Sequence, residues 1–127
     1  MNNLSSWLLE QLLSDDGRQN ADVCDYAPGE SIFLVGDPGD YLAVLLNGAV
    51  EIRKDKHVIS LVDAGCIFGE MGLIDKQPRM ADAISKSHSR VAKIREGQFM
   101  SLLEGSPYFS LAVMRFLTER LRHRIDT

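Results

Sequence analysis

The stretch that decides the fold and the function is FGEMGLIDKQPRMA, residues 68–81. Gly69 and Gly72 permit close approach of the backbone, and residues 70–74 can form one helical turn whose free N–H groups point at an anion. Arg79 follows a rigid proline and adds a guanidinium fork that matches phosphate oxygens. The segment therefore predicts a phosphate-binding loop.

Glu70 places a carboxylate inside this expected anion site, where it would repel a phosphate. The arrangement makes chemical sense if the carboxylate accepts hydrogen bonds from hydroxyl groups, such as those of a ribose. Glu70 and Arg79 together predict a site that binds sugar and phosphate at the same time.

Short apolar runs separated by Gly, Pro, Asp and Asn extend from Val23 to about Ile94, a rhythm typical of an all-β barrel or sandwich. The Asn47-Gly48 pair between two of these runs predicts a tight hairpin. Six runs have the length of a strand: Ser31–Val35, Tyr41–Leu46, Ala49–Arg53, His57–Val62, Ala81–Lys86 and Ser89–Ile94.

Helical periodicity occurs at both ends of the chain. Residues from about 4 to 14 predict a short amphipathic helix. After the strands, a helical stretch is broken at residues 105–107 and a longer helix follows from about Tyr108 to Ile125. The apolar stripe of this last helix predicts a packing seam that could also serve a dimer, and its basic residues 120–124 predict a solvated face or a lid over a ligand.

A chain of 127 residues with 45% hydrophobic residues predicts one domain over residues 1–127, with a barrel at about 22–95 and helices at about 96–126. The net charge of -4 disfavours nucleic acid and anionic membranes as partners. No apolar run approaches the roughly 20 residues that span a bilayer, so we expect a soluble, cytoplasmic protein. Cys24 and Cys66 are expected to be buried, reduced thiols.

Four motifs carry a resemblance to a known family: PGESIF at 28–33, GDPGD at 36–40, LNGAVE at 46–51, and the 68–81 segment. Together they resemble the cyclic nucleotide-binding domain family. This is the sensor module of catabolite-activator-type regulators, protein kinase A regulatory subunits and cyclic-nucleotide-gated channels. Residues 68–81 are similar to the phosphate-binding cassette of the family, with the Glu-to-Arg spacing of the kinase regulatory subunits.

The resemblance implies a mainly β fold, a jelly-roll (double-stranded β-helix) barrel with a short N-terminal helix and C-terminal helices, and no chemistry performed on the ligand. It assigns Arg79 to the cyclic phosphate and Glu70 to the ribose 2′-hydroxyl. Backbone amides would bind the remaining phosphate oxygens, and these belong to Gly69, Met71, Met80 and Ala81.

Recognition of the base is expected to involve Met80 and the last helix. A Thr after the arginine is associated with cGMP preference in the family, so Met80 favours cAMP. Alignment with bacterial members puts Arg120 and Arg124 where the last helix meets the ligand, and a guanidinium there could stack on a purine. Thr118 is the nearest hydroxyl alternative.

The function predicted is that of a sensor for cAMP, or else cGMP, that signals by movement of the last helix about residues 105–107, without cofactor or metal. The alternative is a degenerate, non-binding domain that acts as a protein-interaction module. An enzyme is not expected, because His57, His88 and His123 lack metal-ligand spacing and no nucleophile has an evident base.

Direct DNA binding is not expected either, because Thr127 follows the long helix immediately. The downstream protein is unknown, and a partner chain and a homodimer through the last helix are both open.

Overall fold

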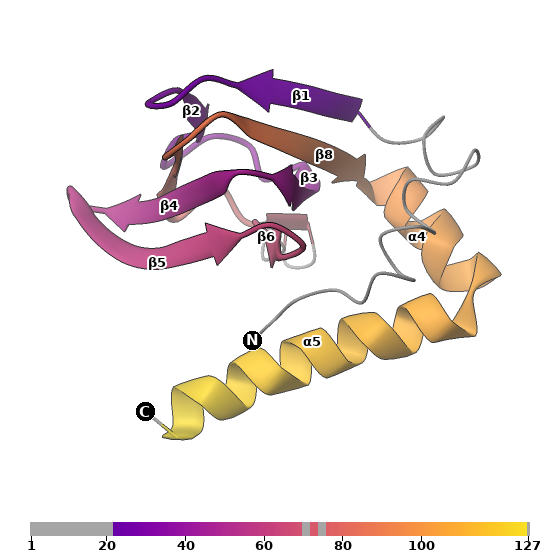
Figure 1. Cartoon of the computed structure of the whole chain (residues 1–127). Helices are drawn as coiled ribbons and strands as arrows, with labels where there is room; N and C mark the ends of the chain where they lie inside the picture. Colours follow the sequence, from indigo (N-terminus) through magenta and orange to yellow (C-terminus); the bar gives the residue numbers. More distant parts are fainter. Residues whose placement is uncertain (1–21, 70–71, 74–75, 127) are drawn as a thin grey trace.

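The computed structural model describes residues 22–69, 72–73 and 76–126, and within the last helix it leaves out the side chains of residues 116, 119, 120 and 123–126. The short helix predicted at about residues 4–14 lies outside this part of the chain. The described residues form two antiparallel sheets followed by two helices (Figure 1).

Each sheet contains four strands, and each is assembled from segments that lie far apart in the sequence. The first sheet has the order β1 (Asp22–Tyr26), β8 (Ser89–Arg95), β3 (Tyr41–Asn47), β6 (Ile67–Phe68). The second has the order β2 (Ser31–Phe33), β7 (Asp82–Ser85), β4 (Ala49–Lys54), β5 (His57–Asp63). The mainly β prediction is confirmed. Strand pairing does not close these two sheets into one barrel within the described residues, so the jelly-roll barrel stays a prediction.

The prediction of a tight hairpin at Asn47-Gly48 is wrong. β3 and β4 belong to different sheets, and the chain crosses from one sheet to the other at this point. Gly48 has a φ of 98°, whereas Asn47 remains part of β3, so the two positive φ angles of a tight primed turn are not present. Gly48 is needed here because a Cβ at this position would collide with Ser89 on β8.

The tight hairpin of the fold lies instead between β4 and β5. Asp55 and Lys56 have φ angles of 52° and 70°, and Lys54 pairs with His57 across them. This is the geometry of a two-residue primed turn, which gives the right-handed twist that the flanking strands require. Neither residue is a glycine, and for this reason the sequence pattern did not reveal the turn.

Alternate residues of the central strand β3 face two different cores. Ala43 and Leu45 point into a core between the two sheets, which also contains Val50 of β4. Leu42 and Val44 point to the opposite face of the first sheet, where the helices pack. All four side chains are 2% exposed or less. Two-sided burial explains why this strand reads as a continuous apolar run.

Helices α4 (Glu96–Gly105) and α5 (Pro107–Asp126) pack on the outer face of the first sheet through Phe99, Phe109 and Val113. The rings of Phe99 and Phe109 meet edge to face at 5.9 Å between centroids. Ser106 separates the helices, and its hydroxyl accepts a hydrogen bond from Phe109 N–H at 3.2 Å. The predicted break at residues 105–107 is confirmed. In the described part of the chain, no helix is long and apolar enough to cross a membrane.

Candidate functional site

Arg79 is fixed by its own backbone against the turn that follows β2. Its N–H donates to the carbonyl of Asp37 at 2.9 Å, and its carbonyl accepts from Gly36 N–H at 2.9 Å. The turn is itself held by side chains, because Leu34 N–H donates to the Asp37 carboxylate at 2.9 Å and Val35 N–H donates to Asp82 at 2.8 Å. The segment before β7 is therefore placed by the 34–37 turn.

The side chain of Arg79 is 4% exposed and points into the end of the inter-sheet core. Its Nη1 donates to the carbonyl of Gly69 at 2.6 Å and its Nη2 donates to the carbonyl of Tyr41 at 2.7 Å. Its guanidinium carbon lies 4.2 Å from the ring centroid of Phe33 and 4.6 Å from that of Tyr41. Two carbonyls and two aromatic faces thus replace the water that a charged group loses on burial.

The glycines of the cassette, which the sequence predicted to permit close approach of the backbone to an anion, leave room for the Arg79 side chain. Gly69 has a φ of 71°, and a Cβ there would lie 2.6 Å from Arg79 Nη1. A Cβ on Gly72 would lie 2.7 Å from the Cα of Gly39 and 3.0 Å from the same nitrogen. Substitution at either position would therefore displace the guanidinium.

The electrostatics of Arg79 favour an anionic ligand. Burial lowers the pKa of the guanidinium, and the neighbouring Tyr41 partly offsets this. Among the described residues, no carboxylate forms an ion pair with Arg79, and its buried Nε has no hydrogen-bond partner. Asp40 and Asp37 act on the guanidinium only as nearby charges, and a buried cation without a direct ion pair gains free energy when an anion reaches it.

Tyr41 links Arg79 to a second cation. Lys93 Nζ lies 4.8 Å from the Tyr41 ring centroid on β3. Burial raises the pKa of the Tyr41 phenol, although Lys93 and Arg79 both act to lower it. The pKa of Lys93 is also raised, because a hydrogen bond to Tyr26 and the nearby tyrosines outweigh its desolvation. The ring of Tyr41 therefore lies close to two cations, Arg79 and Lys93, in a chain with a net negative charge.

The structure places some of the other predicted site residues and leaves the rest outside the described part. Met80 is 58% exposed directly after Arg79, and Ala81 is half-buried. Glu70 and Met71 lie outside the described residues. The backbones of Arg120 and Arg124 belong to α5, but their side chains are not described. Thr118 donates its hydroxyl to the carbonyl of Met114 in its own helix at 2.7 Å, so this donor is already used.

Phe33 and Tyr41 are site residues that sequence reasoning missed. Both belong to the inter-sheet core, and they meet edge to face at 6.5 Å between ring centroids. The available signal was an aromatic residue next to each end of the turn region at residues 34–40, which is typical of an ordinary core residue. They contact Arg79 only because the fold brings residues 33, 41 and 79 together. The spacing of these residues along the sequence does not predict such a contact.

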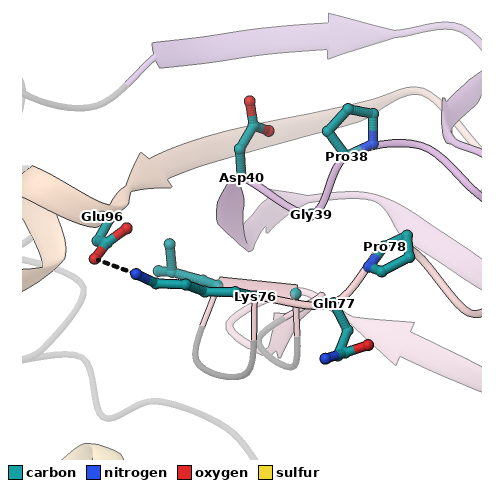
Figure 2. Close-up of a pocket in the computed structure, with 9 residues that line it drawn as sticks. Pro38, Gly39, Asp40, Lys76, Gln77, Pro78 and Glu96 are labelled. Carbon is teal, nitrogen blue, oxygen red and sulfur yellow. Dashed lines mark ion pairs between the residues drawn. The ribbon is translucent and has the colours of Figure 1, made fainter.

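A pocket of about 370 Å³ lies against the cassette (Figure 2). It is lined by residues 38–40, 72–73 and 76–78 and by Glu96 at the start of α4, and Lys76 Nζ is 3.7 Å from Glu96 Oε1 across it. Both side chains of this ion pair are more than half exposed, so it contributes little to stability. Arg79 itself does not line this pocket, but Gly72, which does, lies close to the guanidinium.

The described part of the chain contains two cysteines and no cluster of metal-ligating residues. No group of three His, Cys, Asp or Glu residues there could hold a metal ion. Cys24 and Cys66 form no disulfide and are half-buried, less buried than predicted. Cys24 lies on β1 and Cys66 precedes β6, at opposite edges of the first sheet, and burial raises the pKa of the Cys66 thiol. A disulfide between them is excluded by this separation.

Comparison with known families gives a match to the model for the cyclic nucleotide-binding domain over residues 23–106. The chain belongs to this family. The match includes every described strand, the cassette with Arg79, and α4, so the resemblance inferred from four short motifs is confirmed.

Two relatives of this domain are regulators. It is 33% identical over 101 residues to a cAMP-dependent protein kinase regulatory subunit of Aspergillus niger, covering 76% of this chain and 25% of the relative. It is 26% identical over 103 residues to the CRP-like cAMP-activated global transcriptional regulator of Mycobacterium tuberculosis, covering 77% of this chain and 46% of the relative. The chain thus spans half or less of the length of these two relatives.

The fold of the domain also matches a solved structure. The catabolite activator protein of Thermus thermophilus superposes with a TM-score of 0.79 at 24% identity, covering 95% of this chain and 57% of the other. At this level of identity the likeness supports the fold alone. It extends over both sheets and both helices, because it covers nearly the whole chain.

Proposed function

We propose that this domain is a regulatory sensor that binds a cyclic nucleotide, with cAMP as its ligand, and that it performs no chemistry on it. The observation that carries the proposal is the buried Arg79 guanidinium, which lies within the family's cassette and has no carboxylate partner among the described residues. Two relatives whose names include cAMP support the choice of ligand.

The cyclic phosphate would bind Arg79 by exchange of contacts. A guanidinium has five N–H donors, and two of its nitrogens already donate to the carbonyls of Gly69 and Tyr41. The phosphate oxygens would accept hydrogen bonds from Nε and from part of the guanidinium fork. The carbonyls released from Arg79 would then turn toward solvent or the ligand. Because Arg79 is only 4% exposed, this exchange requires the cassette to shift when the nucleotide enters.

The remaining contacts of the proposal follow the family pattern. Glu70 would accept the ribose 2′-hydroxyl, and backbone amides at Gly69, Met71, Met80 and Ala81 would complete the phosphate site. Met80 in place of a hydroxyl residue favours cAMP over cGMP, and its side chain is free to meet a base because it is 58% exposed. Arg120 or Arg124 would stack on the purine when α5 closes.

Signalling would occur through α5. Phe109 and Val113 anchor the first half of this helix on the first sheet, whereas Leu121 in its second half is 60% exposed. A helix held at one end can rotate about the Ser106 junction when ligand contacts favour a closed arrangement. In this proposal the strands form the jelly-roll pocket and α5 reports its occupancy to a downstream protein.

A thermal-shift titration of the full chain with cAMP, cGMP and cyclic dinucleotides tests the ligand class. We expect stabilisation that follows the law of mass action, about 2.7 kcal/mol at 100 times the dissociation constant, and at a lower concentration of cAMP than of cGMP. Stabilisation by a cyclic dinucleotide alone would overturn the choice of ligand.

The second candidate is a non-binding interaction module, and one observation favours it. Each terminal nitrogen of Arg79 already donates a hydrogen bond to a backbone carbonyl, as it would if the arginine served only to hold the cassette to β3. If no cyclic nucleotide stabilises the chain at about millimolar concentration, this second function replaces the first.

A further inference from the structure

The two sheets have four edge strands, and three of them are protected from pairing with another chain. β2 and β6 contain three and two residues, which is too short to template a partner strand. β1 carries Asp22 and Asp25 within five residues, and both carboxylates form ion pairs with arginines of β8. Two copies of β1 in antiparallel contact would bring four carboxylates together, and this repulsion opposes pairing.

β5 is the fourth edge and has none of these protections. It contains seven residues and ends the second sheet, with no described strand paired to its outer side. Six of its seven residues are exposed, including three large apolar side chains. Val58 is 49% exposed, and Ile59 and Leu61 are each 58% exposed. Water covers an apolar strand edge here, which is an arrangement that soluble proteins normally avoid.

The charges at the two ends of β5 indicate what would cover it. Lys54, Lys56 and His57 lie at its start, with Asp55 as the acidic residue among them, and Asp63 ends it. The basic and acidic ends attract each other when a second copy of the same strand runs antiparallel, whereas parallel pairing would place like charges side by side. The strand is therefore electrostatically self-complementary in one orientation.

We propose that β5 of one chain pairs antiparallel with β5 of a second copy, which joins the two second sheets into one continuous sheet across a twofold axis. With the axis at Ser60, His57 faces Asp63 and Ile59 faces Leu61 of the other copy. Ile59 of each copy then meets an apolar side chain, and the basic start of each strand, with Lys54 and Lys56, lies beside the acidic end of the other at Asp63. This geometry is isologous, as a twofold interface must be.

The register shift on the inner side of β5 is compatible with this interface. Ile52 pairs with Ser60 and Arg53 pairs with Val58, so Ile59 is the extra residue of a β-bulge. A bulge increases the local twist of a strand and makes the edge a poor fit for a flat partner. A second β5 carries the same bulge, so both strands twist in the same way around the axis.

The expected association is weak. One seven-residue strand pair buries less than the roughly 1,200 Å² of a standard stable interface. We therefore expect a monomer–dimer equilibrium that becomes visible between about micromolar and about millimolar concentration. This dimer is independent of nucleotide and differs from association through α5.

Sedimentation velocity of the full chain over that concentration range tests the proposal. We expect a concentration-dependent dimer that the double variant I59K/L61K abolishes, because four lysines would then face one another. V23K is the matched control, since Val23 is 45% exposed on the protected edge β1, and M114K is the control for α5, where Met114 is 57% exposed. Both controls should dimerise like the unmodified chain.

A charge-swap experiment keeps the test valid if the lysine variant is less stable. I59E/L61E should also be monomeric, and an equimolar mixture with I59K/L61K should form a heterodimer that salt weakens. A chain that stays monomeric at all concentrations, a dimer that survives I59K/L61K, or a dimer that M114K disrupts would each overturn the proposal.

Discussion

At the residue scale, Arg79 contributes to folding as well as to the proposed binding. Replacement by Ala would deprive the part-buried carbonyl of Gly69 and the buried carbonyl of Tyr41 of this donor and would remove the cation from the two aromatic rings. Each orphaned group costs about 1–3 kcal/mol, and loss of a buried charge returns part of this. We therefore expect Arg79→Ala to lower the free energy of unfolding by about 2–4 kcal/mol in the absence of nucleotide, measured by urea denaturation.

Arg90→Ala is the matched control for that measurement. Arg90 forms an ion pair with Asp25 at 3.2 Å in which both side chains are about half exposed, so its loss should change stability by less than about 1 kcal/mol. Equal stabilities of the two variants would show that the buried contacts of Arg79 do not hold the cassette.

Tyr41 gives the fold a pH dependence at alkaline pH. The folded state raises the pKa of this phenol above its unfolded value through burial, and it also raises that of Lys93. A group whose pKa is higher in the folded state than in the unfolded state stabilises the fold while it is protonated. This stability is fully present below the pKa of the unfolded state and is lost as the pH rises through the pKa of the folded state. Since unfolded Tyr and Lys titrate near pH 10, and arginine stays protonated there, stability should fall above about pH 10.

Tyr41→Phe should reduce this alkaline loss, as measured by the urea midpoint between about pH 8 and 11. Tyr108→Phe is the control, because Tyr108 is 72% exposed on α5. If both variants follow the same pH profile, Tyr41 is not the group responsible.

At the element scale, the strands and the turns differ in how far the sequence could predict them. Short apolar runs between turn residues predicted β3, β4, β5, β7 and β8 to within one residue at either end. β1 was missed because two aspartates interrupt it, and β6 because it has two residues. Asn47-Gly48 carried a local hairpin signal, but the tertiary crossing between sheets determined the conformation there.

The β4–β5 turn offers a direct test at this scale. Asp55 and Lys56 hold positive φ angles that non-glycine residues adopt at a cost of about 1–2 kcal/mol each. Replacing the pair by Asn-Gly should raise the free energy of unfolding by about 0.5–1 kcal/mol, because the new residues favour a primed turn. The same Asn-Gly pair at Glu51-Ile52, inside β4, should destabilise the domain. If Asn-Gly at residues 55–56 fails to stabilise the domain, as it is expected to fail at residues 51–52, the result would argue against the primed turn.

At the scale of the whole molecule, the fold brings together groups that no local pattern connects. The sequence predicted Arg79 and the cassette glycines from spacing alone, and the structure places Gly69 against Arg79. The carbonyl of Tyr41 and the ring of Phe33 could not be predicted, because a backbone acceptor and a core aromatic residue carry no sequence signal of their own. Two sheets and a turn at residues 34–37 are required to assemble them.

The most direct test of the proposed function is calorimetric titration of the full chain with cAMP, together with Arg79→Lys and Arg90→Lys. Lysine keeps the charge at each position but loses the planar fork. The proposal predicts saturable binding of one cAMP per chain, a loss of at least about tenfold in affinity for Arg79→Lys, and unchanged affinity for Arg90→Lys. Absence of binding by the unmodified chain at about millimolar cAMP, or equal affinities of all three proteins, would contradict it.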